Sequence, residues 1–274
     1  MTTVSRPSLR IAIAGLGAVG RTVAQRIASG AVPGVILAAV AARHVDKARA
    51  FLDSIAVEVP VVPVGELAAH ADVVIECAPA AMLAEIARPV LAAAKTIVVL
   101  SAGALLEFPE LVELARTSGG RIVVPTGALL GLDAVAAAAE GRITAIRMIT
   151  RKPVRGLAGA PYLAENGIRV EEIVAPLRVF NGTAREAAKG FPANLNVAVA
   201  LSLAGIGPDE TRLEIWADPA ATRNVHRILL ESDAARLDMT IENIPSENPK
   251  TGRITAQSVL AVLRKMNAPL RVGT

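Results

Sequence analysis

The chain has 274 residues, of which 53% are hydrophobic, yet only four Phe, one Trp and one Tyr are aromatic. So few rings argue against a protein that binds single-stranded nucleic acid by base stacking. The net charge is +4, but the charged residues are spread along the chain without a basic run. We therefore expect a solvated surface and no nucleic-acid partner.

The mean hydropathy of +0.47 raises the question of a membrane span. The most apolar stretch, residues 73–106, is interrupted by charged side chains well before the roughly 18 uncharged residues that a span needs. The single cysteine, Cys77, excludes an internal disulfide and a metal site built on paired thiolates. Residues 1–9 lack the apolar segment of a secretory signal. We expect a cytoplasmic protein with no membrane partner and no metal.

Apolar runs alternate with helix-like segments through the first 125 residues. We expect strands over residues 10–14, 35–41, 57–62, 71–77, 96–100 and 121–124. The intervening segments favour helices over residues 21–29, 46–53, 65–69, 80–94 and 109–117. Strands that are apolar on both faces and alternate with helices indicate a parallel sheet covered on both sides. The fold class is α/β, with an N-terminal Rossmann domain over residues 1–125.

The rhythm changes near residue 125, because later strands alternate apolar and polar residues. We expect strands over residues 143–151, 170–181, 212–217 and 237–243, and helices over 131–139, 195–204 and 254–265. Few crossover helices separate these strands, so residues 126–274 are expected to form an α+β substrate, catalytic and oligomerisation domain with a mostly antiparallel sheet. The last helix, about 254–266, is a candidate to pack back on the first domain. One sheet face has no intrachain cover, which predicts a homo-oligomer, a dimer.

A glycine-rich turn follows the first expected strand. Gly15, Gly17 and Gly20 have the spacing G-x-G-x-x-G, with Ala18 and Val19 between the last two. This spacing gives a tight turn, a bare backbone for a pyrophosphate and close packing of the next helix on the strand. A strand before the turn and a helix after it favour a dinucleotide site over a glycine turn of another kind.

The end of the second expected strand bears on which dinucleotide binds. An acidic residue there holds the ribose 2′-hydroxyl of NAD, whereas an arginine accommodates the 2′-phosphate of NADP. This chain has Arg43, and no acidic residue until Asp46. We expect NADP, or use of both NAD and NADP; the alternative is that Arg43 only faces solvent.

Of the three histidines, His226 is the candidate for chemistry. His44 and His70 are expected at the surface, whereas His226 ends a polar segment, residues 217–226, that we interpret as a turn leading out of a strand. A hydride transfer that makes an imine needs a group that moves a proton at neutral pH, and imidazole is suited to that. A structural role for His226 is the alternative.

Several further segments, together with the glycine turn, make the chain resemble the L-aspartate dehydrogenase family over essentially its whole length. The segments are Ser-Ala-Gly-Ala-Leu at 101–105, Pro-Thr-Gly-Ala at 125–128, Arg-Lys-Pro at 151–153, Phe-Pro-Ala-Asn-Leu-Asn-Val at 191–197, Ala-Asp-Pro at 217–219, Asn-Val-His at 224–226 and Glu-Asn-Ile-Pro at 242–245. The resemblance implies NAD(P)-dependent oxidative deamination of L-aspartate to iminoaspartate, oxaloacetate and ammonia, and the reverse reaction. It implies His226 as the active-site histidine and dinucleotide contacts at Ala128 and Asn196, where a side-chain amide can pair with the nicotinamide carboxamide.

A dicarboxylic amino acid needs cationic or amide partners. Lys152, Asn194 and Arg223 are candidates, and each is also explained by a surface or capping role. Two other functions stay open: a related amino acid or imino acid reductase with another substrate, and a dinucleotide sensor without catalysis. A panel of amino acids separates the first from an aspartate enzyme, and cofactor binding without turnover marks the second.

Overall fold

The computed structural model describes residues 7–192, 195–245 and 252–273. The chain divides into two compact units, which we describe separately. Unit 1 comprises Met1–Pro125 and Ala256–Val272, and unit 2 comprises Thr126–Thr255 with Gly273–Thr274. No helix among the described residues is long and apolar enough to cross a membrane.

Unit 1 is built on a five-stranded parallel sheet in the order β2-β1-β3-β4-β5. Its strands are β1 (Leu9–Ala14), β2 (Val35–Ala41), β3 (Val73–Glu76), β4 (Thr96–Val99) and β5 (Arg121–Val123). Its helices are α1 (Ala18–Ala28), α2 (Val45–Ser54), α3 (Leu67–His70), α4 (Leu83–Ala92), α5 (Glu110–Ser118) and α10 (Ile254–Asn267), with short 3-10 helices at Val64–Glu66, Ala80–Met82 and Ala102–Leu106. The doubly wound architecture expected from the alternating apolar runs is therefore observed.

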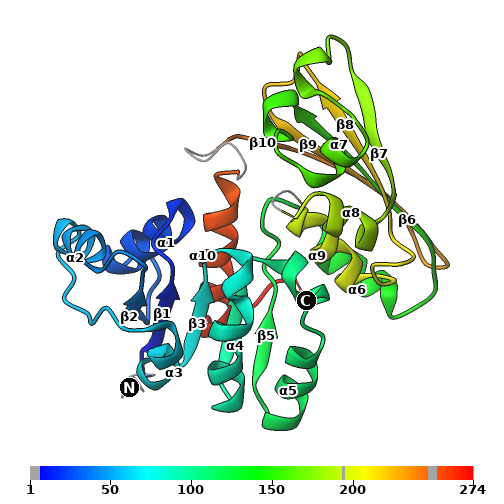
Figure 1. Ribbon diagram of the computed structural model, residues 1–274. Coiled ribbons are helices and arrows are strands. Elements are labelled where there is room, and N and C mark those ends of the chain that lie inside the picture. The colour runs from blue at the N-terminus through cyan, green and yellow to red at the C-terminus, as the bar shows by residue number, and fades with distance from the viewer. Residues whose placement is uncertain (1–6, 193–194, 246–251, 274) are drawn as a thin grey trace. The chain divides into compact units, whose positions relative to one another are not determined.

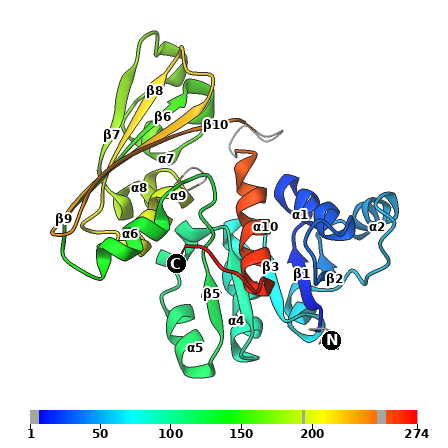
Figure 2. The ribbon, with the colours of Figure 1, turned by 180° about the vertical axis from the view of Figure 1, so that it is seen from behind.

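The two faces of this sheet carry different side chains. Ala12, Ala14 and neighbouring small residues pack against α3, α4 and α5, whereas Ile11 and Ile13 pack against α1 and α10 (Figures 1 and 2). The alternation places every second strand residue on the same face. Because both faces are buried, all the central strand positions are apolar, which is the pattern seen in the sequence.

One expected strand of this unit, residues 57–62, is not formed. The segment makes only an isolated bridge between Val40 and Val61. Pro60 and Pro63 explain the difference, because proline has no N–H to donate to a neighbouring strand.

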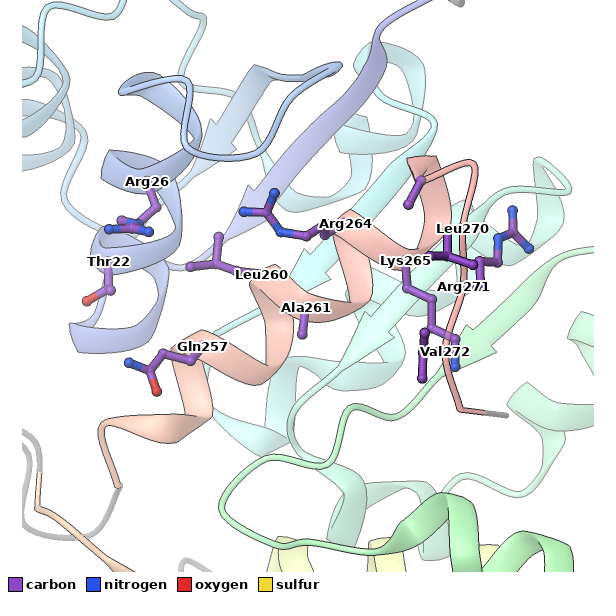
Figure 3. A pocket seen from close by; sticks show the side chains of 11 residues that line it. Thr22, Arg26, Gln257, Leu260, Ala261, Arg264, Lys265, Leu270, Arg271 and Val272 are labelled. Carbon is purple, nitrogen blue, oxygen red and sulfur yellow. The ribbon is translucent and has the colours of Figure 1, made fainter.

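The last long helix, α10, packs on α1 in unit 1. Val259 and Leu263 join the same core as Val23 and Ile27. At the end of the helix Asn267 Nδ2 donates to the Pro33 carbonyl at 3.0 Å. Figure 3 shows the groove of about 640 Å³ that runs along both helices and the tail after them. None of the residues that line this groove was a predicted site residue.

Unit 2 has a five-stranded sheet in the order β10-β9-β6-β8-β7, in which only β6 and β8 are parallel. The strands are β6 (Ile143–Pro153), β7 (Leu177–Thr183), β8 (Arg212–Asp218), β9 (Asn224–Ser232) and β10 (Arg236–Asn243). The helices are α6 (Leu132–Ala139), α7 (Pro161–Glu165), α8 (Ala184–Gly190) and α9 (Asn196–Ala204), with 3-10 helices at Val154–Gly156 and Val170–Glu172. The expected mostly antiparallel sheet is thus observed with one strand more, β9, and with β7 starting later than expected.

The helices of unit 2 cover one face of the sheet. Met148, Ile215 and Ile228 point to that face and share a core with Val135 of α6 and Leu201 of α9. We call it the inner face. The α8 helix begins with a capping box in which Thr183 and Glu186 each accept from the other's backbone N–H.

Candidate active site

The three glycines of the turn after β1 are required for different reasons. Gly15 has φ of +101°, and a Cβ there would lie 2.6 Å from the Cys77 carbonyl oxygen. A Cβ at Gly20 would collide with the carbonyl oxygen of Gly15, so the helix α1 can approach the turn only at a glycine. Gly17, in contrast, has an ordinary φ of −77°, and nothing lies within 4 Å of a Cβ built on it.

The open space at Gly17 fits a dinucleotide pyrophosphate. No protein atom requires a glycine at this position, whereas a phosphate group that approaches the backbone does. Gly17 is the N-cap of α1, and Ala18 and Val19 are its first residues. Their amide groups and the helix dipole favour an anion at this end of the helix. The residues present therefore fit the group that the sequence predicts.

Arg43 follows the end of β2, the strand beside β1 in the sheet. Its side chain is exposed and its Nε lies 3.3 Å from Nε2 of His44, which is also exposed. The carboxyl end of a parallel strand next to the glycine turn is where an adenosine ribose lies in folds of this kind. The position suits a contact with the ribose, and it leaves the Arg43 side chain accessible.

A buried carboxyl group lies at the same edge of this sheet. Glu76 ends β3, is 0% exposed, and accepts from the Leu100 and Ser101 amides at 3.1 and 2.9 Å. Burial raises the pKa of Glu76, although these hydrogen bonds oppose the shift. Burial also raises the pKa of the adjacent Cys77 thiol, so Cys77 is not an activated nucleophile. Glu76 thus ties the loop after β4 to the end of β3.

In unit 2, His226 lies within a strand and not in a polar turn, which corrects the interpretation of residues 217–226. It is the third residue of β9, is 2% exposed, and stands opposite Thr150 of β6. The Thr150 hydroxyl is 3.1 Å from His226 Nδ1. Met148 and Ile228 are the next opposed pair on the same face, each two residues away along its strand, and both belong to the apolar core. His226 and Thr150 therefore continue the inner face as polar residues.

Lys152 completes this polar end of the inner face. It lies two residues after Thr150 on β6 and is 3% exposed. The pKa of His226 is lowered to about 3, first by burial and then by the positive charge of Lys152. The imidazole is therefore neutral at neutral pH and free of a proton on one nitrogen, which is the state needed to accept a proton.

A third strand brings an amide to the same end. Asn243, the last residue of β10, is buried, and its Nδ2 donates to the Ala128 carbonyl at 2.8 Å. Ala128 lies in the turn after Gly127 and is half-buried. The register places Ile241 opposite His226 and Asn243 opposite Asn224, so Asn243 shares the inner face. We call Thr150, Lys152, His226 and Asn243 the polar cluster.

The remaining predicted residues have other surroundings. Asn196 is half-buried at the start of α9. Arg223 precedes β9, is half exposed and pairs with Glu242 at 3.6 Å. Asn194 lies outside the described residues. Among the residues that the structure describes there is no group of three or more His, Cys, Asp or Glu that could hold a metal ion.

Comparisons with known proteins agree with this arrangement in both units. A family model described as aspartate dehydrogenase, C-terminal, matches residues 133–266, and one described as homoserine dehydrogenase, NAD binding domain, matches residues 15–125. An L-aspartate dehydrogenase of Bordetella bronchiseptica is 62% identical over 98% of this chain and 99% of its own length. The chain belongs to the L-aspartate dehydrogenase family. Another member, from Bradyrhizobium diazoefficiens, is 57% identical over 97% of this chain and 94% of its own.

The fold is also that of a solved member of the family. The crystal structure of aspartate dehydrogenase from Thermotoga maritima matches with a TM-score of 0.71 at 23% identity, covering 97% of this chain and 99% of that one. At this identity the match supports the fold.

Three residues of interest in this L-aspartate dehydrogenase family member were not singled out from the sequence. Glu76 carried a signal, because it is charged in a strand that is otherwise apolar. Thr150 carried one too, since it interrupts the apolar inner positions of β6. Asn243 gave none beyond its place in a shared segment, because its contact with Ala128 joins residues 115 positions apart.

Proposed function

We propose that this chain catalyses the NAD(P)-dependent oxidative deamination of L-aspartate to oxaloacetate and ammonia through iminoaspartate, and the reverse reductive amination. The observation that carries the proposal is the buried, neutral His226 beside the buried cation Lys152, in a chain 62% identical to an L-aspartate dehydrogenase. A dinucleotide sensor would have no use for a proton acceptor and a cation buried side by side on a sheet.

Unit 1 supplies the dinucleotide site in this proposal. The amides at the start of α1 and the open side of Gly17 bind the pyrophosphate. When bound, the cofactor supplies the nicotinamide that accepts hydride from Cα of the amino acid. Asn196 and the Ala128 turn are proposed to contact the dinucleotide as well, as the family resemblance implies.

His226 is proposed to move the proton in the hydrolytic half of the reaction. Water adds to the iminium carbon and gives a proton to the neutral imidazole, which returns it to the leaving amine. The net reaction consumes L-aspartate, water and oxidised cofactor, and yields oxaloacetate, ammonium, reduced cofactor and one proton. Thr150 holds the ring through Nδ1, so Nε2 is the nitrogen left for this exchange.

Lys152 is proposed to bind a carboxylate of the substrate. It has the strongest case of the three candidates, because its side chain is buried in the polar cluster, where its positive charge acts on His226. Arg223 is engaged with Glu242 at the surface, and Asn194 stays a prediction. Burial is the main cause of the lowered pKa of His226, and the charge of Lys152 adds to it; an anion beside Lys152 offsets that second contribution and makes the imidazole a stronger base when substrate is bound.

Steady-state turnover tests the proposed function. L-aspartate is assayed with NAD and with NADP, and oxaloacetate plus ammonia with each reduced cofactor. A panel of other amino acids serves as the comparison. Turnover with L-aspartate well above that with the panel is expected. Preference for another amino acid would favour the related reductase, and cofactor binding with no turnover would favour the sensor.

Replacing Arg43 by alanine is expected to raise the KM for NADP and to leave the KM for NAD nearly unchanged. The guanidinium follows β2, where a 2′-phosphate needs a positive charge, and its side chain is exposed. The expected rise is about tenfold, the size of one charge-assisted hydrogen bond to phosphate. Arg49→Ala, an exposed arginine in the body of α2, is the control. An unchanged KM for NADP would remove Arg43 from the cofactor site.

We also propose that the chain works as a homodimer through the outer face of the unit 2 sheet. That face has no covering helix among the described elements, and it carries a hollow of about 410 Å³ around Trp216, whose Nε1 donates to Glu214 at 3.0 Å. Arg151 Nη1 pairs with Asp218 at 2.8 Å on the same face. Aromatic residues and arginine are enriched at protein interfaces, and the hollow is lined by Trp216 with Arg147, Arg151 and Arg227.

Light scattering is expected to give twice the 28.3 kDa of one chain at working concentration. Trp216→Glu is expected to shift the population toward the monomer, because it removes the apolar centre of the face and adds a charge. Val112→Glu, at a side chain that is exposed in α5, is the control. A wild-type mass of one chain contradicts the proposal.

The compartment stays an expectation from composition. The only cysteine, Cys77, is a free thiol and has no second cysteine to pair with. A protein that does not depend on disulfides is suited to a reducing cytoplasm, where we propose that it works.

A further inference from the structure

The side-chain oxygen of Asn243 is a buried acceptor of the polar cluster whose bonding is incomplete. Its residue is 3% exposed, and its Oδ1 has no hydrogen-bond partner among the described residues. Leaving a buried acceptor unpaired is costly, so such atoms are rare in folded proteins. We propose that Asn243 Oδ1 is a binding group that accepts an N–H donor from the bound ligand, namely the amino group of the substrate.

The orientation of the amide is fixed by the protein. The Ala128 carbonyl can only accept, so the atom that faces it at 2.8 Å must be the nitrogen. The oxygen therefore points the other way and cannot be exchanged with the nitrogen by rotation of the amide. Gly252 lies on one side of it, since a Cβ built there would be 3.2 Å from Oδ1. The Oδ1 atom of Asn243 is thus a hydrogen-bond acceptor with a fixed orientation.

The surroundings select the kind of donor. Thr150 and His226 already bond to each other, and Lys152 brings a positive charge that suits a carboxylate. Oδ1 is an acceptor at the same end of the inner face, two residues beyond Ile241, which stands opposite His226. An amino acid offers carboxylates to a cation and an amine to an acceptor. The cluster therefore matches both ends of an amino dicarboxylate, an inference that rests on the proposed function.

The same acceptor could take the N–H of a nicotinamide carboxamide, because Ala128 is one of the residues expected to contact the dinucleotide. Both ligands offer the same chemistry, an N–H donor. The experiment therefore needs one ligand pair for each source, in which the two members differ by that donor alone.

The test measures dissociation constants by calorimetry for the wild type and Asn243→Ala. L-aspartate and succinate, which lacks the amino group, are titrated into protein saturated with reduced cofactor. NAD and its 3-acetylpyridine analogue, which lacks the carboxamide N–H, are titrated into the free protein. Loss of one hydrogen bond from a charged amine is expected to weaken L-aspartate about tenfold or more and to leave succinate within about twofold.

Asn166→Ala is the matched control, because Asn166 Nδ2 donates to the Tyr162 carbonyl at the same 2.8 Å but at an exposed helix end. It is expected to change none of the four constants. If Asn243→Ala lowers the melting temperature strongly, Asn243→Ser, which also lacks Oδ1, takes its place.

Each remaining outcome decides the matter. A selective loss for NAD over its analogue would assign Oδ1 to the cofactor and overturn the substrate assignment. Equal losses for all four ligands, or none, would reduce Asn243 to a structural contact with Ala128 and overturn the proposal. If the wild type neither binds nor oxidises L-aspartate, the proposed function fails, and the two dinucleotides alone decide whether Oδ1 binds an N–H donor.

Discussion

His226→Ala is expected to lower kcat for L-aspartate by about 10²-fold or more while the dissociation constant of the dinucleotide stays unchanged. Loss of a general acid and base costs about this much. Dinucleotide affinity is expected to hold because the glycine turn and α1 belong to unit 1, whereas His226 lies in β9 of unit 2. Steady-state kinetics and a fluorescence titration of the reduced cofactor measure the two quantities.

Two variants of Thr150 test whether its hydroxyl positions the His226 ring, and a variant of another histidine is the control. Thr150→Val removes the hydroxyl that holds Nδ1 at nearly constant volume, so it is expected to lower kcat less than His226→Ala does. Thr150→Ser, which keeps the hydroxyl, is expected to restore most of the activity. His70→Ala, at the end of α3 in unit 1, is the control and is expected to behave as the wild type. A kcat near the wild-type value in His226→Ala would remove this residue from the mechanism.

The lowered pKa of His226 predicts how the free energy of unfolding changes with pH. A pKa of about 3 in the folded chain, against 6.5 for an ordinary histidine, means that the folded state binds fewer protons than the unfolded state between these values. The stability that this group contributes is therefore complete above about pH 6.5 and is lost as the pH falls toward 3. Urea unfolding at several pH values is expected to show this slope in the wild type and a smaller one in His226→Leu.

The lowered pKa of His226 also predicts how kcat/KM depends on pH. The value of kcat/KM reports the free enzyme, so protonation of His226 should not lower it between pH 7 and about 5. An acid limb near pH 6.5 in the kcat/KM of the wild type would contradict a buried neutral imidazole.

The sheet of unit 1 could be predicted because its strands are buried on both faces. Five of the six expected strands formed, and their central residues are apolar, as in Val35–Ala41, which is apolar throughout. Residues 57–62 were predicted wrongly because their valines have the composition of a strand, whereas Pro60 and Pro63 lack the N–H that pairing requires.

The strand β9 was missed for a reason connected with function. Its sequence begins with Asn224 and contains His226 and Arg227, so the period of two between polar and apolar residues is hidden at its start. The inner face is polar there, and a pattern that assumes an apolar inner face fails where the site begins. From the sequence, His226 stood out because of its chemistry and the family resemblance; its partners Thr150 and Asn243 are assembled by the register of three strands.

Gly20→Thr is expected to destabilise the protein, whereas Gly17→Thr is expected to leave stability nearly unchanged and to weaken dinucleotide binding. Gly20→Thr should lower the free energy of unfolding by about 3 kcal/mol or more, because its Cβ meets the backbone carbonyl of Gly15, which cannot move aside as a side chain can. Gly17→Thr should leave unfolding within about 0.5 kcal/mol of the wild type, since the site is open, φ is ordinary, and threonine and glycine rank alike at a helix N-cap.

Dinucleotide affinity is the measurement in which Gly17→Thr is expected to show its effect. Gly17→Thr places a side chain where the pyrophosphate is proposed to lie, so the dissociation constant of the reduced cofactor is expected to rise about tenfold or more in a protein that is otherwise fully folded. Gly65→Thr is the control, because Gly65 is exposed and nothing lies within 4 Å of a Cβ built on it. Gly30 has equally open surroundings, but its φ of +70° would strain a threonine. Unchanged affinity in Gly17→Thr would mean that the open space at the start of α1 does not hold the cofactor. A stable Gly20→Thr would mean that the turn can widen, and the close packing of α1 on β1 would then not depend on this glycine.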